Sequence, residues 1–240
     1  MSPDTETVKR FFDGPFYLER GRHIIRIRAM VVQEFLGDVH GTRMLDIGCG
    51  DGSLSIPFLE KVSALTLVDL SPRMLELAEA RIPDHLRGRV ELVNTPLEGF
   101  EPGAAYDIII CVGVLAHVPS IDATLAKVAS CLKPGGLAVL EFAPNPNPLG
   151  GILSPYYALR RVFSGVKPAY STNKMPLAQL LLAAEKHGLH LQKLRRHSFP
   201  LPGMGRWSKE LLYKYALCTL NNPLLSKIGV EHLMLFKKAC

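Results

Sequence analysis

The first 40 residues show the hydrophobic period of a helix. Between residues 24 and 35, apolar side chains recur at three- and four-residue spacing, and Gly14-Pro15 interrupts the pattern earlier. We therefore expect helix over residues 1–40, broken near residue 14. From residue 44 onward the period changes, and short apolar runs begin to alternate with helical patterns.

Five apolar runs have the length of strands, and helical patterns separate most of them. The runs lie at residues 44–47, 64–68, 90–93, 106–112 and 137–142, and the helical patterns lie at 53–62, 71–82 and 120–132. Ser71 has the character of an N-cap, and Pro72 follows at the first helical position. The run at 106–112 is almost wholly apolar, as expected for a strand buried on both faces of a parallel sheet. This alternation predicts a doubly wound, mostly parallel α/β fold with right-handed crossovers.

The alternation loosens after residue 144. Residues 145–175 are rich in Pro, Gly, Ser and Tyr, and residues 198–229 are also irregular, with a helical pattern inside them at 208–220. We expect a further helix and two strands, at residues 176–187, 189–195 and 231–236. We expect one domain over residues 1–240, with a helical lid at 1–40, a ligand-binding core at 41–144, cap insertions at 145–229 and a last strand at 230–238.

Composition narrows the class of protein. Of the 240 residues, 48% are hydrophobic and 21% are charged, which excludes a disordered chain. No apolar run approaches the roughly 18 residues of a spanning helix, and the polar N-terminus lacks the pattern of a secretion signal. The five cysteines are scattered, so we expect a cytoplasmic protein without a disulfide framework or a structural zinc site.

The net charge of +6 is unevenly distributed. Residues 1–144 hold 14 Lys and Arg against 19 Asp and Glu, whereas residues 145–240 hold 14 against 3. The strongly basic C-terminal part serves solubility, or it attracts an anionic substrate, partner or membrane surface.

The clearest chemical signal is the stretch LDIGCGDG, residues 45–52. It follows an expected strand, and Gly48, Gly50 and Gly52 allow the backbone to turn sharply and approach a ligand. Asp69 stands about 20 residues further on, after the second expected strand, where an acidic side chain bonds the hydroxyls of a ribose. The pair of signals predicts a ligand that contains a nucleoside. The alternative for Asp69 is a helix-cap carboxylate beside Ser71.

Four motifs together resemble a known family. LDIGCGDG, VDLS, GVLAHVP and LKPGGLAVLEF match in order and spacing the class I S-adenosylmethionine-dependent methyltransferases, over about residues 40–145. The resemblance implies a seven-stranded sheet whose last strand is antiparallel and lies beside the fifth. It also implies S-adenosylmethionine as cofactor and S-adenosylhomocysteine as product. The cofactor-binding residues then expected are Tyr17, Arg22, Asp46, Gly48, Cys49, Gly50, Asp69, Leu70, Pro96, Leu97 and Val112.

The main rival for the glycine motif is a dinucleotide-binding dehydrogenase. Such enzymes usually have G-x-G-x-x-G spacing, whereas the glycines here follow Asp46 in the order G-x-G-x-G, which favours the methyltransferase interpretation. Two positions depart from the family pattern. Pro96 stands where an acidic residue commonly binds the adenine, so packing by Leu97 and backbone groups must replace it, and Ala116 stands where many relatives carry Glu.

The roles of the remaining candidates follow from their positions. His117 follows the fourth expected strand and is the first candidate for a catalytic base or a helix-packing residue. Tyr17 and Arg22, on the N-terminal helix, are placed to reach the methionine carboxylate, as in related lids. Candidate substrate-binding residues are His23, Tyr156, Tyr170, His197 and Trp207. Neither a nucleobase-methyltransferase motif nor a Mg²⁺-binding aspartate cluster is present, so we expect no metal.

We therefore expect methyl transfer to a small molecule, most simply to a hydroxyl or carboxyl oxygen of a biosynthetic intermediate. The alternatives are N- or C-methylation of a small molecule, an RNA methyltransferase, and a non-catalytic cofactor-binding scaffold. The loose segments mix aromatic and cationic residues, so we expect an apolar, anionic substrate or a peripheral membrane contact. We expect no DNA partner, and the absence of aromatic–basic interleaving argues against RNA. The oligomeric state is left open.

Overall fold

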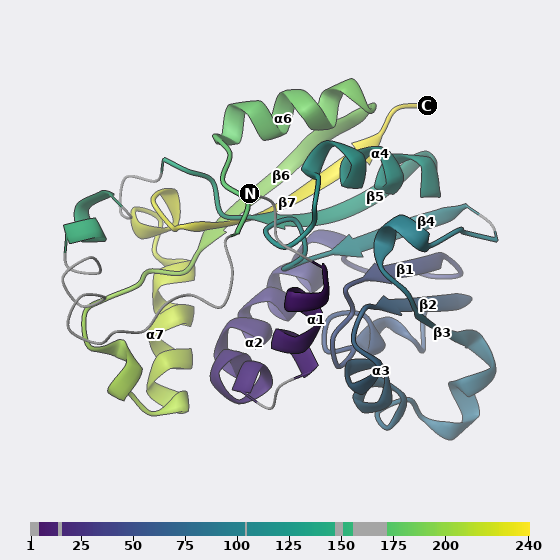
Figure 1. Cartoon of the computed structure of the whole chain (residues 1–240), viewed down its shortest axis with the longest axis horizontal. Helices are drawn as coiled ribbons and strands as arrows, with labels where there is room; N and C mark the ends of the chain where they lie inside the picture. The colour runs from purple at the N-terminus through teal and green to yellow at the C-terminus, as the bar shows by residue number, and fades with distance from the viewer. Residues whose placement is uncertain (1–4, 14–15, 104, 147–150, 156–171) are drawn as a thin grey trace.

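The chain folds around a seven-stranded sheet in a computed structural model that describes residues 5–13, 16–103, 105–146, 151–155 and 172–240. The strands are β1 Arg43–Ile47, β2 Ala64–Asp69, β3 Val90–Asn94, β4 Tyr106–Cys111, β5 Leu132–Phe142, β6 Leu189–His197 and β7 Glu231–Lys238. Their order is β3-β2-β1-β4-β5-β7-β6, and β7 alone runs antiparallel to its neighbours (Figure 1). The predicted doubly wound sheet, with its antiparallel last strand beside the fifth, is confirmed.

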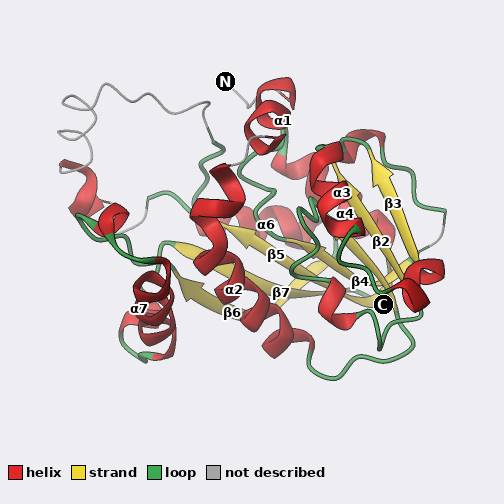
Figure 2. Ribbon diagram, turned by 90° about the horizontal axis from the view of Figure 1, so that it is seen from below, coloured by secondary structure: helices red, strands yellow, loops and turns green. Residues whose placement is uncertain are grey.

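Helices cover both faces of the sheet (Figures 1 and 2). The described α-helices are α1 Thr5–Asp13, α2 Phe16–Leu36, α3 Pro72–Glu79, α4 Ile121–Cys131, α6 Leu177–Lys186 and α7 Lys209–Asn221, and the described 3-10 helices are η1 Ile56–Phe58, η2 Asp84–Arg89, η3 Leu97–Gly99, η4 Met204–Arg206 and η5 Leu225–Lys227. Buried side chains of α4 and α6 join one hydrophobic cluster, and those of α2, α3 and α7 join the cluster on the other face. No helix among the described residues is long and apolar enough to cross a bilayer.

Serine caps begin three of these helices. The hydroxyl oxygen of Ser71 accepts a hydrogen bond from the backbone N–H of Met74, and Ser120 and Ser208 act in the same way for α4 and α7. Each cap satisfies one of the N–H groups that have no partner within the helix. The start of α3 at Pro72, after its Ser71 cap, is as the sequence predicted.

The prediction of a helix at residues 53–62 is wrong. This segment is a series of turns around the short 3-10 helix η1. Pro57 has no backbone N–H, so the helical hydrogen-bond series cannot pass through it. The hydroxyl of Ser55 is also drawn away to Asp46. The other expected helices and strands are present with shifted ends, and the largest shift is in β5, which begins at Leu132 rather than residue 137.

One edge of the sheet collects the ends of most strands. Strands β1 to β5 run parallel, β6 runs in the same direction, and β7 begins where β6 ends because Glu231 pairs with His197. In open α/β sheets, ligands bind outside this carboxyl edge. The functional site is therefore expected at this edge.

Candidate active site

A pocket of about 130 Å³ opens at the carboxyl ends of β1, β2, β3 and β4. Its floor is the loop after β1, and its walls come from the segments after the other three strands. Helix α1 contributes Val8, Lys9 and Phe12 from above. The pocket is therefore formed by one sheet edge and covered by the N-terminal segment of the chain.

The glycine loop has the conformation that close approach to a ligand requires. Gly48 has a φ angle of +65°, and a Cβ atom at this position would lie 2.4 Å from Cγ2 of Val114. Gly52, at φ +70°, would clash in the same way with Ile56. Side chains are thus excluded both by backbone conformation and by space, which leaves the loop open toward the pocket.

Asp69 stands at the end of β2 with both carboxylate oxygens bonded to the backbone. One oxygen accepts the N–H of Gly50 at 2.8 Å and the other accepts the N–H of Ser71 at 2.8 Å. The bond to Ser71 is the helix-cap contact that the sequence left as the alternative. Because each carboxylate oxygen has a second lone pair, the side chain can still accept bonds from two ligand hydroxyls. Burial raises the pKa of Asp69, and the backbone bonds oppose that shift.

Asn94, at the end of β3, was missed by the sequence analysis. Its side-chain amide donates to the carbonyl oxygens of Asp69 at 2.9 Å and Leu70 at 3.1 Å. The amide thereby holds the loop after β2 in place. An asparagine that directly follows an expected strand was the available signal.

Asp46 lies behind the glycine loop and is 1% exposed. Its Oδ2 atom accepts a hydrogen bond from the hydroxyl of Ser55 at 2.6 Å. Burial raises the pKa of Asp46 to about 7, in spite of that bond, and the charges of Asp69 and Asp51 raise it further. The pocket therefore has beside it an acid that changes charge near neutral pH.

His117 and α1 meet over this pocket. His117 lies in the segment after β4, and the ring of Phe12 contacts it edge-on with 5.4 Å between centroids. Burial lowers the pKa of His117 to about 4, and the charge of Arg28 acts in the same direction. Asp13, at the end of α1, accepts a hydrogen bond from the hydroxyl of Ser71 and so ties the lid to the start of α3.

A second, larger cavity of about 630 Å³ lies between α2 and the segment that joins β6 to α7. Its walls are about half apolar and half polar, and the apolar part includes Ile24, Ile27, Phe199 and Met204. Three of the polar lining groups, His197, Ser198 and Glu231, contact one another, and His23 and Arg206 also line the cavity. A cavity with apolar walls and converging polar groups is the usual form of a small-molecule site.

The ion pair of Arg28 and Glu141 separates the two cavities. Arg28 bonds Glu141 through Nε at 2.8 Å and through Nη2 at 2.6 Å. A Cβ atom at Gly113, which lines the first pocket, would lie 3.5 Å from Nη1 of Arg28. On the other side, Glu141 bonds His197 at 2.9 Å. Burial opposes ionisation of Glu141, but the Arg28 charge and the His197 bond outweigh it and lower the pKa to about 2.

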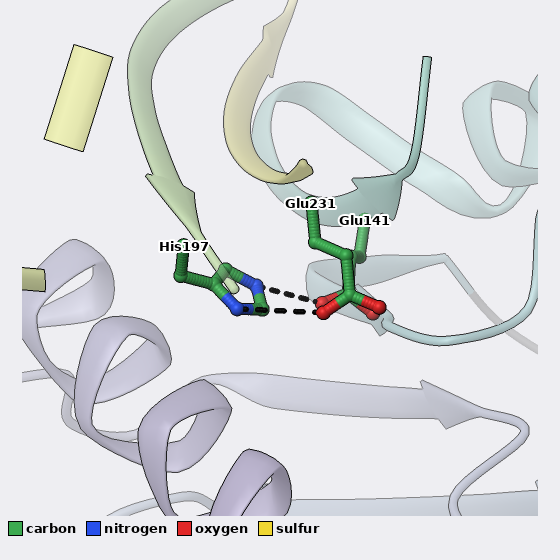
Figure 3. A group of neighbouring side chains, drawn as sticks. All are labelled: Glu141, His197 and Glu231. Atoms are coloured by element: carbon green, nitrogen blue, oxygen red, sulfur yellow. Dashed lines mark hydrogen bonds and ion pairs between the residues drawn. The ribbon is translucent and has the colours of Figure 1, made fainter. Parts of the chain in front are cut away.

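Glu141, His197 and Glu231 also offer three metal-ligand atoms within 4.8 Å of one another (Figure 3). Arg28 already supplies a positive charge to this group, because its Nη2 atom lies 2.6 Å from Glu141 and 3.9 Å from Glu231. The cluster thus has a cation of its own, and we do not assign a metal to it.

The structure brings most of the predicted cofactor residues to the first pocket. Those that line it are Gly48, Gly50, Asp69, Leu70, Pro96, Leu97, Val112 and the catalytic candidate His117. Asp46 and Cys49 are buried next to the loop rather than in the lining. Arg22 is exposed on α2, and the side chain of Tyr17 lies outside the described residues.

The predicted substrate residues divide between the second cavity and undescribed segments. His23 and His197, which are 174 positions apart, both line the cavity. Trp207 is not in its lining but contacts the lining residue Tyr215 edge-on at 5.4 Å. Tyr156 and Tyr170 lie outside the described residues. Arg28, Glu141 and Glu231 were not predicted from the sequence. Two signals were visible, since Arg28 is a charge inside an apolar helix pattern and Glu141 is a charge inside an apolar strand.

Comparison with known proteins gives consistent matches. A family described as "Methyltransferase domain" matches residues 45–138. A ubiquinone biosynthesis O-methyltransferase of Bordetella avium is 31% identical over 175 residues, which cover 70% of each chain. One from Leptothrix cholodnii is 28% identical over 196 residues, 80% of this chain and 82% of the relative. The magnesium protoporphyrin IX methyltransferase of Synechocystis PCC 6803 with bound SAH has the same fold, with a TM-score of 0.67, 16% identity, and coverage of 98% of this chain and 99% of that chain.

Replacement of Asp69 by Ala should weaken S-adenosylmethionine binding. The change leaves two ligand hydroxyls without their acceptor, which costs about 1–3 kcal/mol, or roughly 5- to 150-fold in Kd. Isothermal titration measures the change, and Asp84→Ala on the exposed 3-10 helix η2 is the control. An unchanged Kd for Asp69→Ala would show that Asp69 does not hold the ribose.

Cofactor affinity should increase as the pH rises toward the pKa of Asp46. The folded-state pKa is raised to about 7, so Asp46 is protonated below that pH and must ionise to attract a cationic ligand. Affinity should fall by up to about tenfold per pH unit below the pKa and level off above it. In Asp46→Asn the rise of cofactor affinity with pH should disappear. A rise that persists in this variant would assign the pH dependence to another group.

Folding stability should change in the opposite direction. Above the unfolded-state pKa, folding takes up a proton at Asp46, so the contribution of this group to stability falls as pH rises from about 4 to about 7. These two pH dependences can be separated by thermal melts with and without cofactor.

The pocket combines a sterically constrained glycine loop, a carboxylate at the end of β2 and a covering helix, on a fold that matches the solved methyltransferase structure with a TM-score of 0.67. The residues present fit S-adenosylmethionine, and close sequence relatives extend over most of the chain. The chain belongs to the class I S-adenosylmethionine-dependent methyltransferases.

Proposed function

We propose that the chain transfers a methyl group from S-adenosylmethionine to an oxygen atom of a small molecule. The observation that carries the choice of oxygen is that the matched curated relatives are named O-methyltransferases. When bound, the cofactor supplies an activated methyl group, and the chain's own residues bind, orient and desolvate the acceptor.

The second cavity is the proposed acceptor site. Its volume of about 630 Å³ suits a drug-sized molecule, and its apolar walls with one polar end suit an acceptor with an apolar body and a hydroxyl group. The polar end is next to the Arg28–Glu141 pair, and Gly113 of the cofactor pocket touches that pair from the other side. The acceptor's polar end would therefore face the cofactor pocket.

His117 remains a candidate for the acceptor side of the cofactor pocket. A pKa of about 4 means that its ring is neutral at neutral pH and a weak base. We therefore favour a role in orienting the acceptor over proton removal. His117→Ala would then raise the acceptor KM more than the Kd of the cofactor.

N- or C-methylation of a small molecule is the nearest alternative, followed by RNA methylation and by a non-catalytic scaffold. The named relatives favour oxygen over nitrogen and carbon. The cavity volume of about 630 Å³ favours a small molecule over RNA, whose recognition needs stacking platforms and phosphate contacts. The intact pocket for the cofactor fits turnover and does not by itself exclude a scaffold.

Matched phenol and amine probes test the proposal. The purified chain should methylate a phenol such as catechol or 4-hydroxybenzoate at oxygen and leave aniline unmodified, with S-adenosylhomocysteine formed in equal amount by mass spectrometry. Methylation of aniline alone, or binding of the cofactor without any turnover on small molecules, would contradict it.

Filling the second cavity should block the acceptor and spare the cofactor. Ala216 lines this cavity, so Ala216→Phe should raise the acceptor KM about tenfold or more while the cofactor Kd stays unchanged. The control is Ala123→Phe, which adds the same ring at an exposed position of α4. An unchanged KM in Ala216→Phe would place the acceptor elsewhere.

The surface near the cavity supports the expected contact with an anionic membrane. Exposed apolar side chains at Leu211 and Leu224 lie in the same stretch as Lys209, Lys214 and Lys227. The chain should co-sediment with vesicles that contain phosphatidylglycerol and release from them in high salt. Equal binding to neutral phosphatidylcholine vesicles would refute an electrostatic contact.

A further inference from the structure

A continuous chain of polar contacts runs along the polar end of the second cavity, and Figure 3 shows three of its side chains, Glu141, His197 and Glu231. Nε2 of His197 lies 2.9 Å from Glu141, and Nδ1 lies 3.0 Å from the hydroxyl oxygen of Ser198. The hydroxyl of Ser198 in turn bonds Glu231. Strands β5, β6 and β7 thus contribute to one line of four groups, and its middle member, His197, is 2% exposed.

Counting protons along this line gives a definite result. Arg28 keeps Glu141 ionised, and a carboxylate can only accept, so Nε2 of His197 must carry a proton. The two remaining contacts, from Nδ1 to Ser198 and from Ser198 to Glu231, need one proton each. Ser198 supplies one of them. The second must come from Nδ1 or from Glu231.

The line is therefore complete when it holds one additional proton. The reference state is a neutral His197, a Ser198 hydroxyl and an ionised Glu231. Without that proton, one contact would join two acceptors and would be repulsive. With it, the proton rests on Nδ1 or, after rotation of the Ser198 hydroxyl, on Glu231. A group that gains or loses one proton in this way, next to a substrate cavity, has the form of a base.

Two backbone features hold His197 and Ser198 in this arrangement. Among the described residues, Ser198 is the one non-glycine with a positive φ angle, 64°. A Cβ atom at Gly229 would lie 2.6 Å from the carbonyl oxygen and 2.7 Å from the nitrogen of His197. Unfavourable backbone at a single serine, held by a close glycine contact, is typical of functional sites.

The surroundings place the open end of the line in the cavity. Glu231 has a quarter of its side chain exposed and lines the cavity together with His197. The other charged or titratable groups around the line are Arg28 and His23 on α2, Arg206 on η4, His117 after β4, Arg196 on β6, His232 on β7 and the Tyr215 hydroxyl on α7.

We propose that Glu231, Ser198 and His197 form a proton relay that removes the proton of the acceptor hydroxyl, with Glu141 and Arg28 as positioning residues. This rests on the proposed transfer to oxygen. The relay first releases its additional proton to solvent. The acceptor O–H bond then breaks, and its proton takes the vacated place on Nδ1 of His197 or on Glu231. The acceptor oxygen forms a bond to the methyl carbon as the carbon–sulfur bond breaks, which leaves S-adenosylhomocysteine, and the relay returns its proton to solvent before the next turnover.

Nitrogen-15 NMR of histidine-labelled protein tests the relay without any acceptor. His197, identified by the signal lost in His197→Gln, should carry a proton on Nε2, which faces Glu141, and its Nδ1 resonance should be that of a hydrogen-bonded nitrogen. In Ser198→Gly, which removes the partner of Nδ1, the Nδ1 resonance should move while the Nε2 proton stays. An Nε2 without a proton in the wild type, or an Nδ1 resonance that Ser198→Gly leaves unchanged, would overturn the relay.

Kinetics with catechol give the second readout. The wild-type kcat should rise with pH, because the relay must release its additional proton before it can act as a base, and Ser198→Gly should lower kcat about 100-fold while the cofactor Kd stays unchanged. Glycine suits the positive φ angle, so this variant should fold as well as the wild type. The control is His190→Gln on the exposed side of β6.

The outcomes separate the relay from the proposed function. A wild-type enzyme that methylates catechol, together with a Ser198→Gly variant of unchanged kcat, overturns the relay alone. A wild-type enzyme that methylates aniline but not catechol overturns the proposed transfer to oxygen. This result comes from the wild-type enzyme and needs no variant.

Discussion

A carboxylate buried at the end of a strand either has a raised pKa, as Asp46 does, or pairs with a cation, as Glu141 does with Arg28. Glu141 has 3% of its side chain exposed and both its oxygens bond the guanidinium, while His197 shares one of them. Removing one partner of a buried pair costs about 3–5 kcal/mol, because the other charge is left uncompensated. The pair therefore fixes how α2 lies across β5. It also lies where the cofactor pocket and the second cavity adjoin.

The topology explains why these charges meet. Parallel strands end at one edge, so residues at the ends of β1, β2 and β4 face a common pocket. The antiparallel β7 then begins at that edge, where Glu231 pairs in register with His197. Glu141 lies beside Leu233, two residues further along β7, and so on the same face of the sheet as Glu231. The insertion of β7 thus places a second carboxylate beside the first.

The sequence predicted the sheet and the cofactor pocket because each follows from local signals. Glycine spacing and an acidic residue after the next strand predict the loop and Asp69 without knowledge of distant contacts. The helix at 53–62 failed because periodicity alone gave too little weight to Pro57. The second cavity could not be predicted as a site, since His23 and His197 meet through α2 and β6, elements far apart in the chain.

The expectation that the basic C-terminal part attracts an anionic substrate illustrates the same limit. Residues 145–240 hold only 3 Asp and Glu, yet one of them, Glu231, and Glu141 just before this segment both come to the cavity on β7 and β5. Their charges cannot be assigned to the cavity from sequence, because register and strand order decide it. The polar end of the cavity is therefore close to charge-balanced rather than basic.

That balance suits methyl transfer from a sulfonium to an oxygen. An acceptor anion and a sulfonium cation lose their charges as the new bond forms, so a strongly cationic acceptor site would stabilise the reactants more than the transition state. The carboxylates Glu141 and Glu231 are offset by Arg28, and by His197 when it is protonated. Such a group can bind a hydroxyl and accept its proton without holding the resulting anion tightly. Physical reasoning thus favours a neutralised cluster over a basic pocket at the acceptor end of this site.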